Sequence, residues 1–327
     1  MYPNKRKPIF FESFKLLYFQ AAVMDRRKFI KRGLQTSALL GASSFPLDSF
    51  AASSKSLCVL HTNDVHSRLD PFPMDGGKYA GLGGVVNRER IIKQIRSEER
   101  NVLLLDAGDM FQGTPYYNLY KGKAEIEMMS LLDYDAGTIG NHDFDNGIEA
   151  LAENLKYATF PLVNCNYNFE NTPLQGKIPP YKITKRGGLK IGVLGVGVEL
   201  QGLVLKNLYG NTIYKDPIIA ANKMASYLKK TKKCDYIICL SHLGYRYKTQ
   251  KVSDLTLAQK SEFINLILGG HTHTFLKKPT ELQNKKGKLI LINQVGWAGI
   301  HLGKIHVKFE PKNQLKYQTN LPVKISK

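Results

Sequence analysis

Short apolar runs that alternate with amphipathic stretches constrain the fold of this chain more than any other feature of its sequence. The runs predicted as strands are residues 57–62, 102–106, 136–139, 161–164, 190–196, 236–241, 266–268, 289–293 and 301–309. Helical spacing of apolar residues occurs between several of them, at 85–98, 124–132, 148–157 and 218–230. Strands that alternate with helices in this way predict an α/β fold.

Polar loops directly follow five of the predicted strands. In chain order they are Asn63-Asp64-Val65-His66, Ala107-Gly108-Asp109, Gly140-Asn141-His142-Asp143, Ser241-His242 and Gly269-Gly270-His271-Thr272-His273. Open α/β sheets place their functional sites at the carboxyl ends of their strands. We therefore expect the five loops to meet and form one site.

Five of the eight histidines lie in these loops. The other three, His61, His301 and His306, lie within predicted strands, where a histidine is more often a structural residue, and we exclude them from the site. The loops also supply carboxylate and amide oxygens, and mixed ligands of this kind suit zinc, manganese or iron. Two such ions about 3.5–4 Å apart form the clamp that many phosphatases use. The candidate metal ligands are Asp64, His66, Asp109, Asn141, His242, His271 and His273.

Taken together, the loops resemble the five signature blocks of the calcineurin-like metallophosphoesterases. The longer matches are similar to the 5'-nucleotidase branch of that superfamily, and the similarity covers roughly residues 57–309. These matches are Thr62-Asn63-Asp64-Val65-His66, Gly108-Asp109-Met110-Phe111-Gln112-Gly113-Thr114-Pro115, Gly140-Asn141-His142-Asp143-Phe144-Asp145 and Gly269-Gly270-His271-Thr272-His273-Thr274. The resemblance implies a four-layer αββα sandwich, in which helices flank two mixed β-sheets and the metals lie at the strand ends.

The resemblance also implies a role for each residue of the site. One divalent metal ion would be held by Asp64, His66, Asp109 and His273, and the other by Asp109, Asn141, His242 and His271. His142 would face the substrate phosphate as a catalytic residue, and Asp145 would orient it. Asp145 could also cap the helix that begins near Gly147. The family often has Glu where this chain has Asp143.

The first 51 residues carry the features of an export signal. Asp25-Arg26-Arg27-Lys28-Phe29-Ile30-Lys31 resembles a twin-arginine motif, a mildly apolar stretch follows at 33–45, and Ser49-Phe50-Ala51 offers small residues for cleavage. We therefore predict a leader at 1–51 and a periplasmic or secreted protein. The apolar stretch is too short and too polar to span a bilayer, so no stable membrane insertion is expected.

The predicted division of the chain follows from this leader. Met24 directly precedes the motif, which makes 1–23 a candidate upstream extension. Residues 52–327 would form the catalytic domain. Two-domain members of the 5'-nucleotidase branch continue into a nucleoside-binding domain, which is expected to be absent here, so a separate chain could supply it.

Composition limits the partners of the chain without naming one. The formal charge is +20, and the leader contributes nine Lys/Arg against three Asp/Glu. The lysine-rich stretches at 229–233 and 277–288 lack the interleaved aromatic residues of a single-strand binding groove, so no nucleic-acid partner is expected. The four cysteines form no CxxC motif, and Cys58 and Cys239 lie in apolar runs, as small buried residues do.

The predicted function is metal-dependent hydrolysis of a small phosphate ester, with nucleoside 5'-monophosphates as the favoured substrate. Alternative substrates are a 2',3'-cyclic nucleotide, a sugar phosphate or a thiosulfate-type ester. A metal-binding subunit without independent turnover is a further alternative, but such a protein would not need His142.

Overall fold

The computed structural model describes residues 55–310, 314–319 and 322–326 of the chain. The predicted leader at 1–51 lies outside the described residues. Among the described helices, none is long and apolar enough to cross a membrane.

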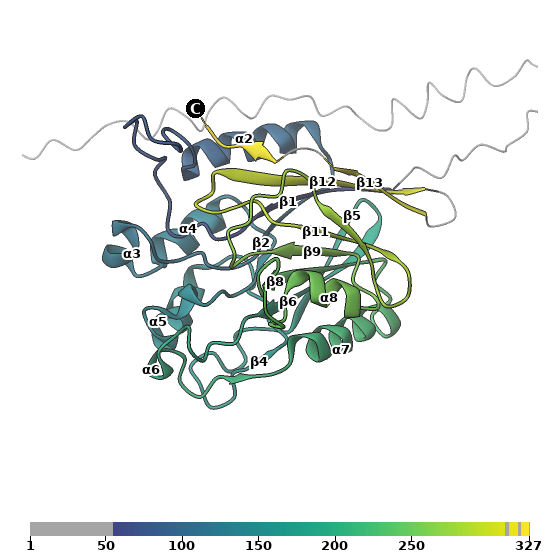
Figure 1. Cartoon of the computed structure of the whole chain (residues 1–327). Coiled ribbons are helices and arrows are strands. Elements are labelled where there is room, and N and C mark those ends of the chain that lie inside the picture. Colours follow the sequence, from purple (N-terminus) through teal and green to yellow (C-terminus); the bar gives the residue numbers. More distant parts are fainter. Residues whose placement is uncertain (1–54, 311–313, 320–321, 327) are drawn as a thin grey trace, which may run out of the picture. The chain divides into compact units, whose positions relative to one another are not determined.

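Two six-stranded sheets form the centre of the molecule (Figure 1). The first has the order β13-β12-β1-β2-β3, with β14 paired to β12, and the second has the order β10-β11-β9-β8-β6-β5. Parallel and antiparallel neighbours occur in both sheets, so both are mixed. The strands of the first sheet are β1 (Lys55–Thr62), β2 (Val102–Asp106), β3 (Ala136–Gly137), β12 (His301–Glu310), β13 (Gln314–Thr319) and β14 (Val323–Lys324). Those of the second are β5 (Tyr181–Arg186), β6 (Leu189–Gly197), β8 (Tyr236–His242), β9 (Leu266–Gly269), β10 (Thr280–Gln283) and β11 (Leu289–Asn293). A small ribbon pairs β4 (Tyr167–Asn168) with β7 (Ile213–Tyr214).

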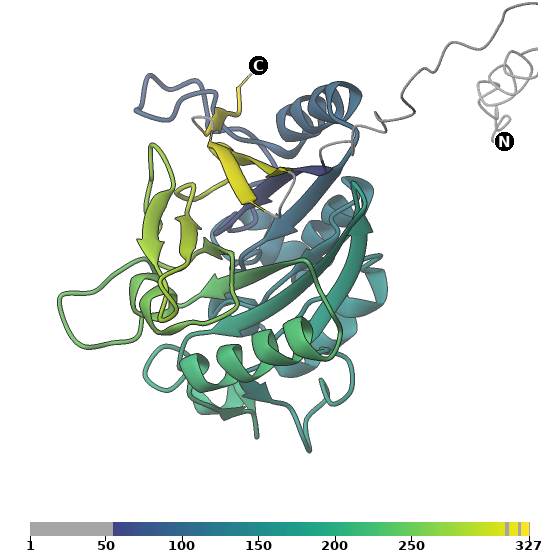
Figure 2. The ribbon, with the colours of Figure 1, turned by 90° about the vertical axis from the view of Figure 1, so that its right-hand side faces the viewer.

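Helices cover the outer face of each sheet (Figures 1 and 2). Helices α2 (Val85–Glu98), α4 (Lys123–Leu131) and α5 (Ile148–Asn154) share a buried apolar cluster with the first sheet. Helices α7 (Pro217–Lys230) and α8 (Asp254–Lys260) share another with the second. The shorter helices are α3 (Pro115–Tyr120) and α6 (Lys206–Tyr209), and the 3-10 turns are η1 (His142–Phe144) and η2 (Leu155–Tyr157).

Successive side chains of a strand alternate between the apolar cluster that lies between the sheets and the cluster under the helices, and this alternation produces the four layers. In β1, Leu57 and Val59 join the apolar cluster between the two sheets, whereas Cys58 and Leu60 join the cluster under the helices. The same alternation occurs in β8, where Ile238 faces the other sheet. Because successive side chains of a strand point to opposite faces, a strand buried on both faces reads as a continuous apolar run. The predicted four-layer αββα sandwich of two mixed sheets flanked by helices is confirmed.

Most of the predicted elements agree with the structure, and one is wrong. Helix α2 and strands β2 and β11 begin and end where they were predicted. The predicted strand at 161–164 is wrong, because this segment makes only an isolated bridge between Leu162 and Gly137. Its backbone is diverted instead toward β6, where Cys165 N–H donates to Gly195 O.

Gly195 allows this close approach, and we predict that Gly195→Ala destabilises the fold. An added Cβ would lie well inside contact distance of Val163 O and Thr138 Oγ1, neither of which can move freely. Overpacking of this kind costs about 1–3 kcal/mol of unfolding free energy, which chemical denaturation measures. Gly192→Ala on the same strand is the control, because the nearest atom there is the flexible Leu228 side chain at 3.0 Å. Equal losses in the two variants would contradict the prediction.

Candidate metal centre

The loops that follow β1, β2 and β9, together with the last residue of β8, bring six of the seven predicted metal ligands into two adjacent clusters. In the first cluster, Asp64, His66 and His273 each offer a ligand atom within 4.8 Å of the other two. The second cluster unites Asp109, His242 and His271 in the same way. Each cluster therefore combines residues from the first sheet with residues from the second.

Asp109 connects the two clusters. Its Oδ2 lies 3.0 Å from His242 Nε2 in its own cluster and 3.9 Å from His66 Nε2 in the other. Asp64 Oδ1 also lies between the clusters, 3.4 Å from His273 Nε2 and 4.0 Å from His242 Nε2. Asp64 and Asp109 are both buried. Two buried carboxylates among imidazoles need positive charge nearby, because an uncompensated buried charge is very costly.

Backbone carbonyls orient two of the imidazoles. His242 Nδ1 lies 2.7 Å from Ala107 O, and His66 Nδ1 lies 3.1 Å from Phe111 O. A ring whose Nδ1–H donates to a carbonyl presents an unprotonated Nε2, which is the form that binds a metal ion. Burial lowers the pKa of His271 to about 4, so that imidazole is neutral.

The charge of Asp109 controls the protonation of His242. Burial alone would lower the pKa of His242, but the negative charge of Asp109, 3.0 Å away, raises this pKa to about 10. In the absence of a cation, a proton on His242 therefore balances the Asp109 carboxylate. A divalent cation between the two residues would take the place of that proton.

Left-handed backbone conformations recur at the site. Five of the predicted ligands have a positive φ, between 50° and 73°: Asp64, His66, Asp109, His271 and His273. Such conformations are uncommon for residues other than glycine, and each costs of order 1–3 kcal/mol. Their concentration in the three loops after β1, β2 and β9 marks these loops as functional.

Asn141 and His142 come from the fifth loop, between β3 and α5. Asn141 is buried, and its Oδ1 accepts no hydrogen bond among the described residues. The His142 backbone N–H donates to Asp109 Oδ1 over 2.8 Å, and its ring centroid lies 5.3 Å from that of His66. The structure therefore brings this loop to the two clusters, as predicted.

His142 and Asp145 form a pair at the edge of the site. Their Nδ1 and Oδ2 atoms are 2.8 Å apart, and this hydrogen bond is the main cause of a raised pKa of His142. Asp145 does not cap the helix, which was the alternative role considered for it. Gly147 occupies the N-cap of α5, which has no side-chain cap, and the Asp145 carboxylate turns toward His142 instead.

A pocket of about 190 Å³ opens over these residues. The residues that line it are His66, Arg68, Gln112, Gly113, His142, His273 and Trp297. The Trp297 ring stacks on His273 with a centroid distance of 5.7 Å and an interplanar angle of 6°. The pocket thus combines imidazoles, one guanidinium group and one aromatic face.

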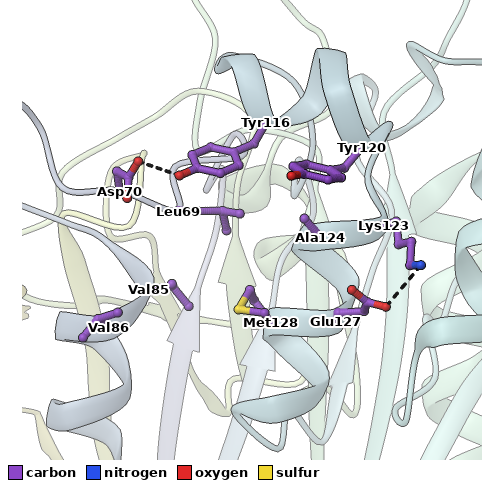
Figure 3. A pocket seen from close by; sticks show the side chains of 10 residues that line it. All are labelled: Leu69, Asp70, Val85, Val86, Tyr116, Tyr120, Lys123, Ala124, Glu127 and Met128. Carbon is purple, nitrogen blue, oxygen red and sulfur yellow. Dashed lines mark hydrogen bonds and ion pairs between the residues drawn. The ribbon is translucent and has the colours of Figure 1, made fainter. Parts of the chain in front are cut away.

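A separate pocket of about 430 Å³ lies beside α3 and α4 (Figure 3). It is mainly apolar, and Tyr116 and Tyr120 stack along one side of it while the Tyr116 hydroxyl donates to Asp70. None of the predicted ligands lines this pocket. It therefore stands apart from the metal clusters.

Three buried residues to which the sequence analysis assigned no role support the loops. Asp143 accepts backbone N–H groups from Gly140 and Asp109, and so joins two loops. Asn63 donates to Asp64 Oδ2 over 2.6 Å. Gln294 donates to Gly270 O beside His271 and accepts from Thr272. Each is a neutral amide or short acid beside a strand end, a pattern too common in sequences to single these residues out.

Comparison with known proteins identifies the family. Residues 58–275 match the sequence pattern of the calcineurin-like phosphoesterases. The chain belongs to the calcineurin-like phosphoesterase family. Enzymes of this family use divalent metal ions, which agrees with the two clusters of candidate ligands.

Relatives of this chain include several 5'-nucleotidases. It is 35% identical to the snake venom 5'-nucleotidase of Naja atra over 83% of this chain and 54% of that protein. Identity to the human 5'-nucleotidase is 34%, over 84% of this chain and 50% of that protein. The structure of a 5'-nucleotidase precursor from Thermus thermophilus superimposes with a TM-score of 0.75 at 33% identity, covering 83% and 55% of the two chains. The chain therefore spans about half the length of the relatives it matches.

Proposed function

We propose that this chain hydrolyses phosphate monoesters at a dinuclear metal centre, with nucleoside 5'-monophosphates as the favoured substrates. The observation that carries the proposal is the position of Asp109, whose carboxylate faces an imidazole of each cluster. A single bridging carboxylate between two ligand sets is the arrangement that a two-metal clamp requires. The family and its 5'-nucleotidase relatives support the same reaction class.

The buried polar atoms of the site fit two cations. Asn141 Oδ1 and His242 Nε2 are buried, and neither has a hydrogen-bond partner among the described residues. Asp109 Oδ2 lies 3.0 Å from the His242 nitrogen as the carboxylate of an ion pair. The Nε2 atoms of His66 and His273 are 3.0 Å apart, so one of them must carry a proton if no metal ion lies between them. Such atoms are those expected to bind an ion, because unpaired buried polar groups are otherwise rare.

Each cation would then have four ligands from the chain. The first set is Asp64, His66, Asp109 and His273, and the second is Asp109, Asn141, His242 and His271. When bound, two divalent ions polarise the phosphoryl group and activate a water molecule for attack. Zinc, manganese and iron all suit this mixture of oxygen and imidazole ligands.

His142 and Asp145 would handle the proton of the leaving group. Asp145 holds Nδ1 of His142, which leaves Nε2 free to donate a proton to the oxygen that departs from phosphorus. The raised pKa of His142 favours the protonated ring needed for that step. His142 lines the pocket together with Arg68, whose positive charge suits an anionic phosphate.

Recognition of the base would be weak in this chain. Of the aromatic residues near the loops, only Trp297 lines the pocket, and it already stacks on His273. Tyr117 is buried against Phe111, and the Tyr247 hydroxyl donates to Leu243 O. We therefore propose that the phosphate supplies most of the binding energy and that a separate polypeptide could add nucleoside contacts.

Asp109→Ala is predicted to remove both metal ions, because the bridge between the two ligand sets is lost. His273→Ala should mainly weaken one ion, since this residue belongs only to the first cluster. Elemental analysis of the purified variants measures the metal content. Two equivalents of tightly bound metal in Asp109→Ala would rule out the bridge.

His142→Ala is predicted to retain both metal ions but to lose roughly 10²–10⁴ in turnover, the usual size of an acid–base contribution. The loss should appear with an alkyl phosphate, whose leaving oxygen needs a proton, and should be smaller with an aryl phosphate. Asp145→Asn is the matched variant, and it should show a weaker form of the same dependence on the leaving group. Normal turnover of alkyl esters by His142→Ala would exclude the proposed proton transfer.

Substrate selectivity tests whether the phosphate group supplies most of the binding energy. We expect kcat/KM for AMP, ribose 5-phosphate and a simple alkyl phosphate to agree within about tenfold. A base–aromatic stacking platform typically contributes about 1–3 kcal/mol, and roughly 1.4 kcal/mol corresponds to tenfold. A preference for AMP above about a hundredfold would mean that the chain has its own base pocket. No hydrolysis of any ester by the metal-loaded protein would favour a binding subunit instead.

Export through the twin-arginine route remains part of the proposal. Replacing Arg26 and Arg27 by Lys should leave an unprocessed precursor in the cytoplasm, whereas deletion of 1–23 should leave export intact if Met24 is the start. Cell fractionation and the mass of the mature protein measure both effects. A mature chain that still contains Arg27 would contradict a leader at 1–51 and a catalytic domain at 52–327.

A further inference from the structure

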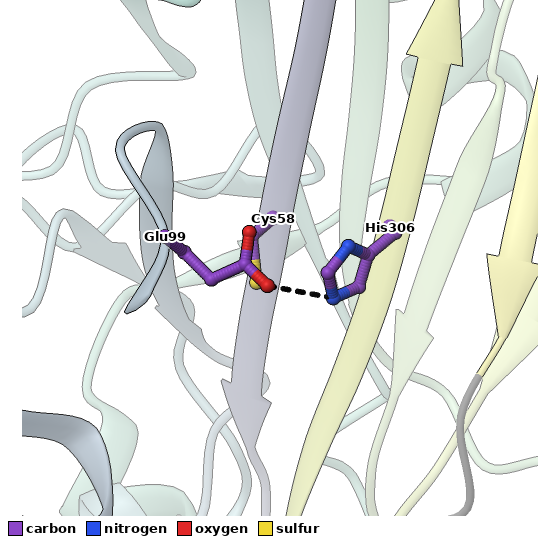
Figure 4. Close-up of side chains that lie close together, drawn as sticks. All are labelled: Cys58, Glu99 and His306. Carbon is purple, nitrogen blue, oxygen red and sulfur yellow. Dashed lines mark ion pairs between the residues drawn. The ribbon is translucent and has the colours of Figure 1, made fainter. Parts of the chain in front are cut away.

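Cys58, Glu99 and His306 form a third cluster of potential metal ligands (Figure 4). It belongs to the middle of β1 and β12 rather than to the loops at the strand ends. Four residues, or about 13 Å of extended chain, separate Cys58 from Thr62, where β1 ends. The cluster shares no residue with either cluster of the candidate catalytic centre.

The fold, rather than the local sequence, brings the three residues together. Strands β1 and β12 are antiparallel, and their register places Cys58 directly opposite His306, so both side chains lie on one face of the sheet. Glu99 follows α2 as its C-cap. The backbone just after Glu99 is held against β1, because Cys58 N–H donates to Asn101 O over 2.9 Å.

The geometry suits a small tetrahedral cation. His306 Nε2 and Glu99 Oε1 are 3.3 Å apart, and all three ligand atoms lie within 4.8 Å of one another. Zinc bonds of about 2.0–2.2 Å to nitrogen and oxygen imply a tetrahedral edge of roughly 3.4 Å. The Cys58 sulfur lies within 4.8 Å of both of these atoms and could supply the third position.

The ligand atoms are also available. Cys58 is buried and makes no disulfide, and His306 Nε2 is buried without a hydrogen-bond partner among the described residues. Partial exposure of Glu99 and His306, at 28% and 19% of their side chains, leaves room for a water molecule as fourth ligand. The sequence alone predicts a small buried residue at Cys58 and a structural histidine at His306. It does not reveal that the two side chains lie close together.

We propose that Cys58, Glu99 and His306 bind one thiophilic divalent cation, such as Zn²⁺, at a site separate from the catalytic centre. A thiolate with an imidazole selects such a cation over Mg²⁺ or Ca²⁺. Binding replaces the thiol proton, which leaves to solvent while the sulfur donates its electron pair to the metal. The ion would fasten the C-terminal end of α2 to β1 and β12 and so stabilise the first sheet.

Two features of the site oppose binding. Burial, followed by the charge of Glu99, raises the pKa of the Cys58 thiol to about 12, so the cation must displace a firmly held proton. Lys304 Nζ lies 3.4 Å from Glu99 Oε1 and competes for the same carboxylate. Both features favour a cation that binds sulfur strongly over one that binds only oxygen.

The experiment uses Co²⁺ added to the full chain after metal removal. A thiolate ligand gives Co²⁺ an intense charge-transfer band in the near ultraviolet, and the proposed catalytic ligands include no cysteine. We expect this band to reach the intensity of one thiolate-bound Co²⁺ per chain once the two sites of the proposed catalytic centre are also filled, and to vanish in Cys58→Ser. Cys165→Ser, which removes another free thiol, is the matched control and should keep the band.

Further variants separate a metal site from a mere effect on folding. Glu99→Gln should weaken Co²⁺ binding, whereas Lys304→Gln should tighten it by at least about fivefold, because a competing positive charge is removed. Zn²⁺ should displace Co²⁺ and raise the melting temperature less in Cys58→Ser than in Cys165→Ser, while both variants keep their phosphatase activity. Absence of the band in the folded native protein, or its persistence in Cys58→Ser, would overturn the proposal.

Discussion

The burial of Asp109 between the two sheets' loops is the constraint on which the rest of the site depends. A carboxylate removed from water is tolerated only where opposite charge and hydrogen bonds compensate for its lost hydration. Here the compensation comes from His242 at 3.0 Å and from the His142 backbone N–H at 2.8 Å. The neighbouring imidazoles and Asn141 are arranged around the same charge. The site is therefore organised as a cage for cations in which the protein supplies the negative charge.

Such a cage stores conformational strain, which the layers on either side must offset. Five ligands adopt a left-handed backbone, and each cost is of order 1–3 kcal/mol. The strands that precede them are buried where they enter the loops, over the last six residues of β1, the last four of β2 and all of β9, so the loops leave rigid supports rather than flexible edges. Asp143 adds to this support by accepting backbone N–H groups from two loops. The buried strand ends and the hydrogen bonds of Asp143 therefore hold the strained ligand loops in place.

The sequence predicted the buried strands and the loop ligands well, because both leave local signals. Strand β8 reads as an apolar run, and His242 ends it, so strand and ligand were found together. Strand β5 was missed because its side chains are all partly or fully exposed and include three Lys and Arg residues. The prediction of a strand at 161–164 was wrong, because an apolar run indicates burial but does not reveal whether its backbone forms a ladder with a neighbouring strand. The cluster of Cys58 with His306 could not be predicted, since it depends on the register of strands 240 residues apart in sequence.

The division of each cluster between two sheets links metal binding to folding. Asp64 and His66 follow β1 in the first sheet, whereas His273 follows β9 in the second, and they can meet only when the apolar layer between the sheets is formed. A ligand that binds only the native state stabilises it by about 4 kcal/mol at a thousand times its dissociation constant. Two such ions would therefore strengthen the packing of the sheets, and the packing would in turn set the affinity for the ions. In this arrangement the candidate metal centre depends on the core of the αββα sandwich, because the ligands of each cluster meet only when the two sheets are packed.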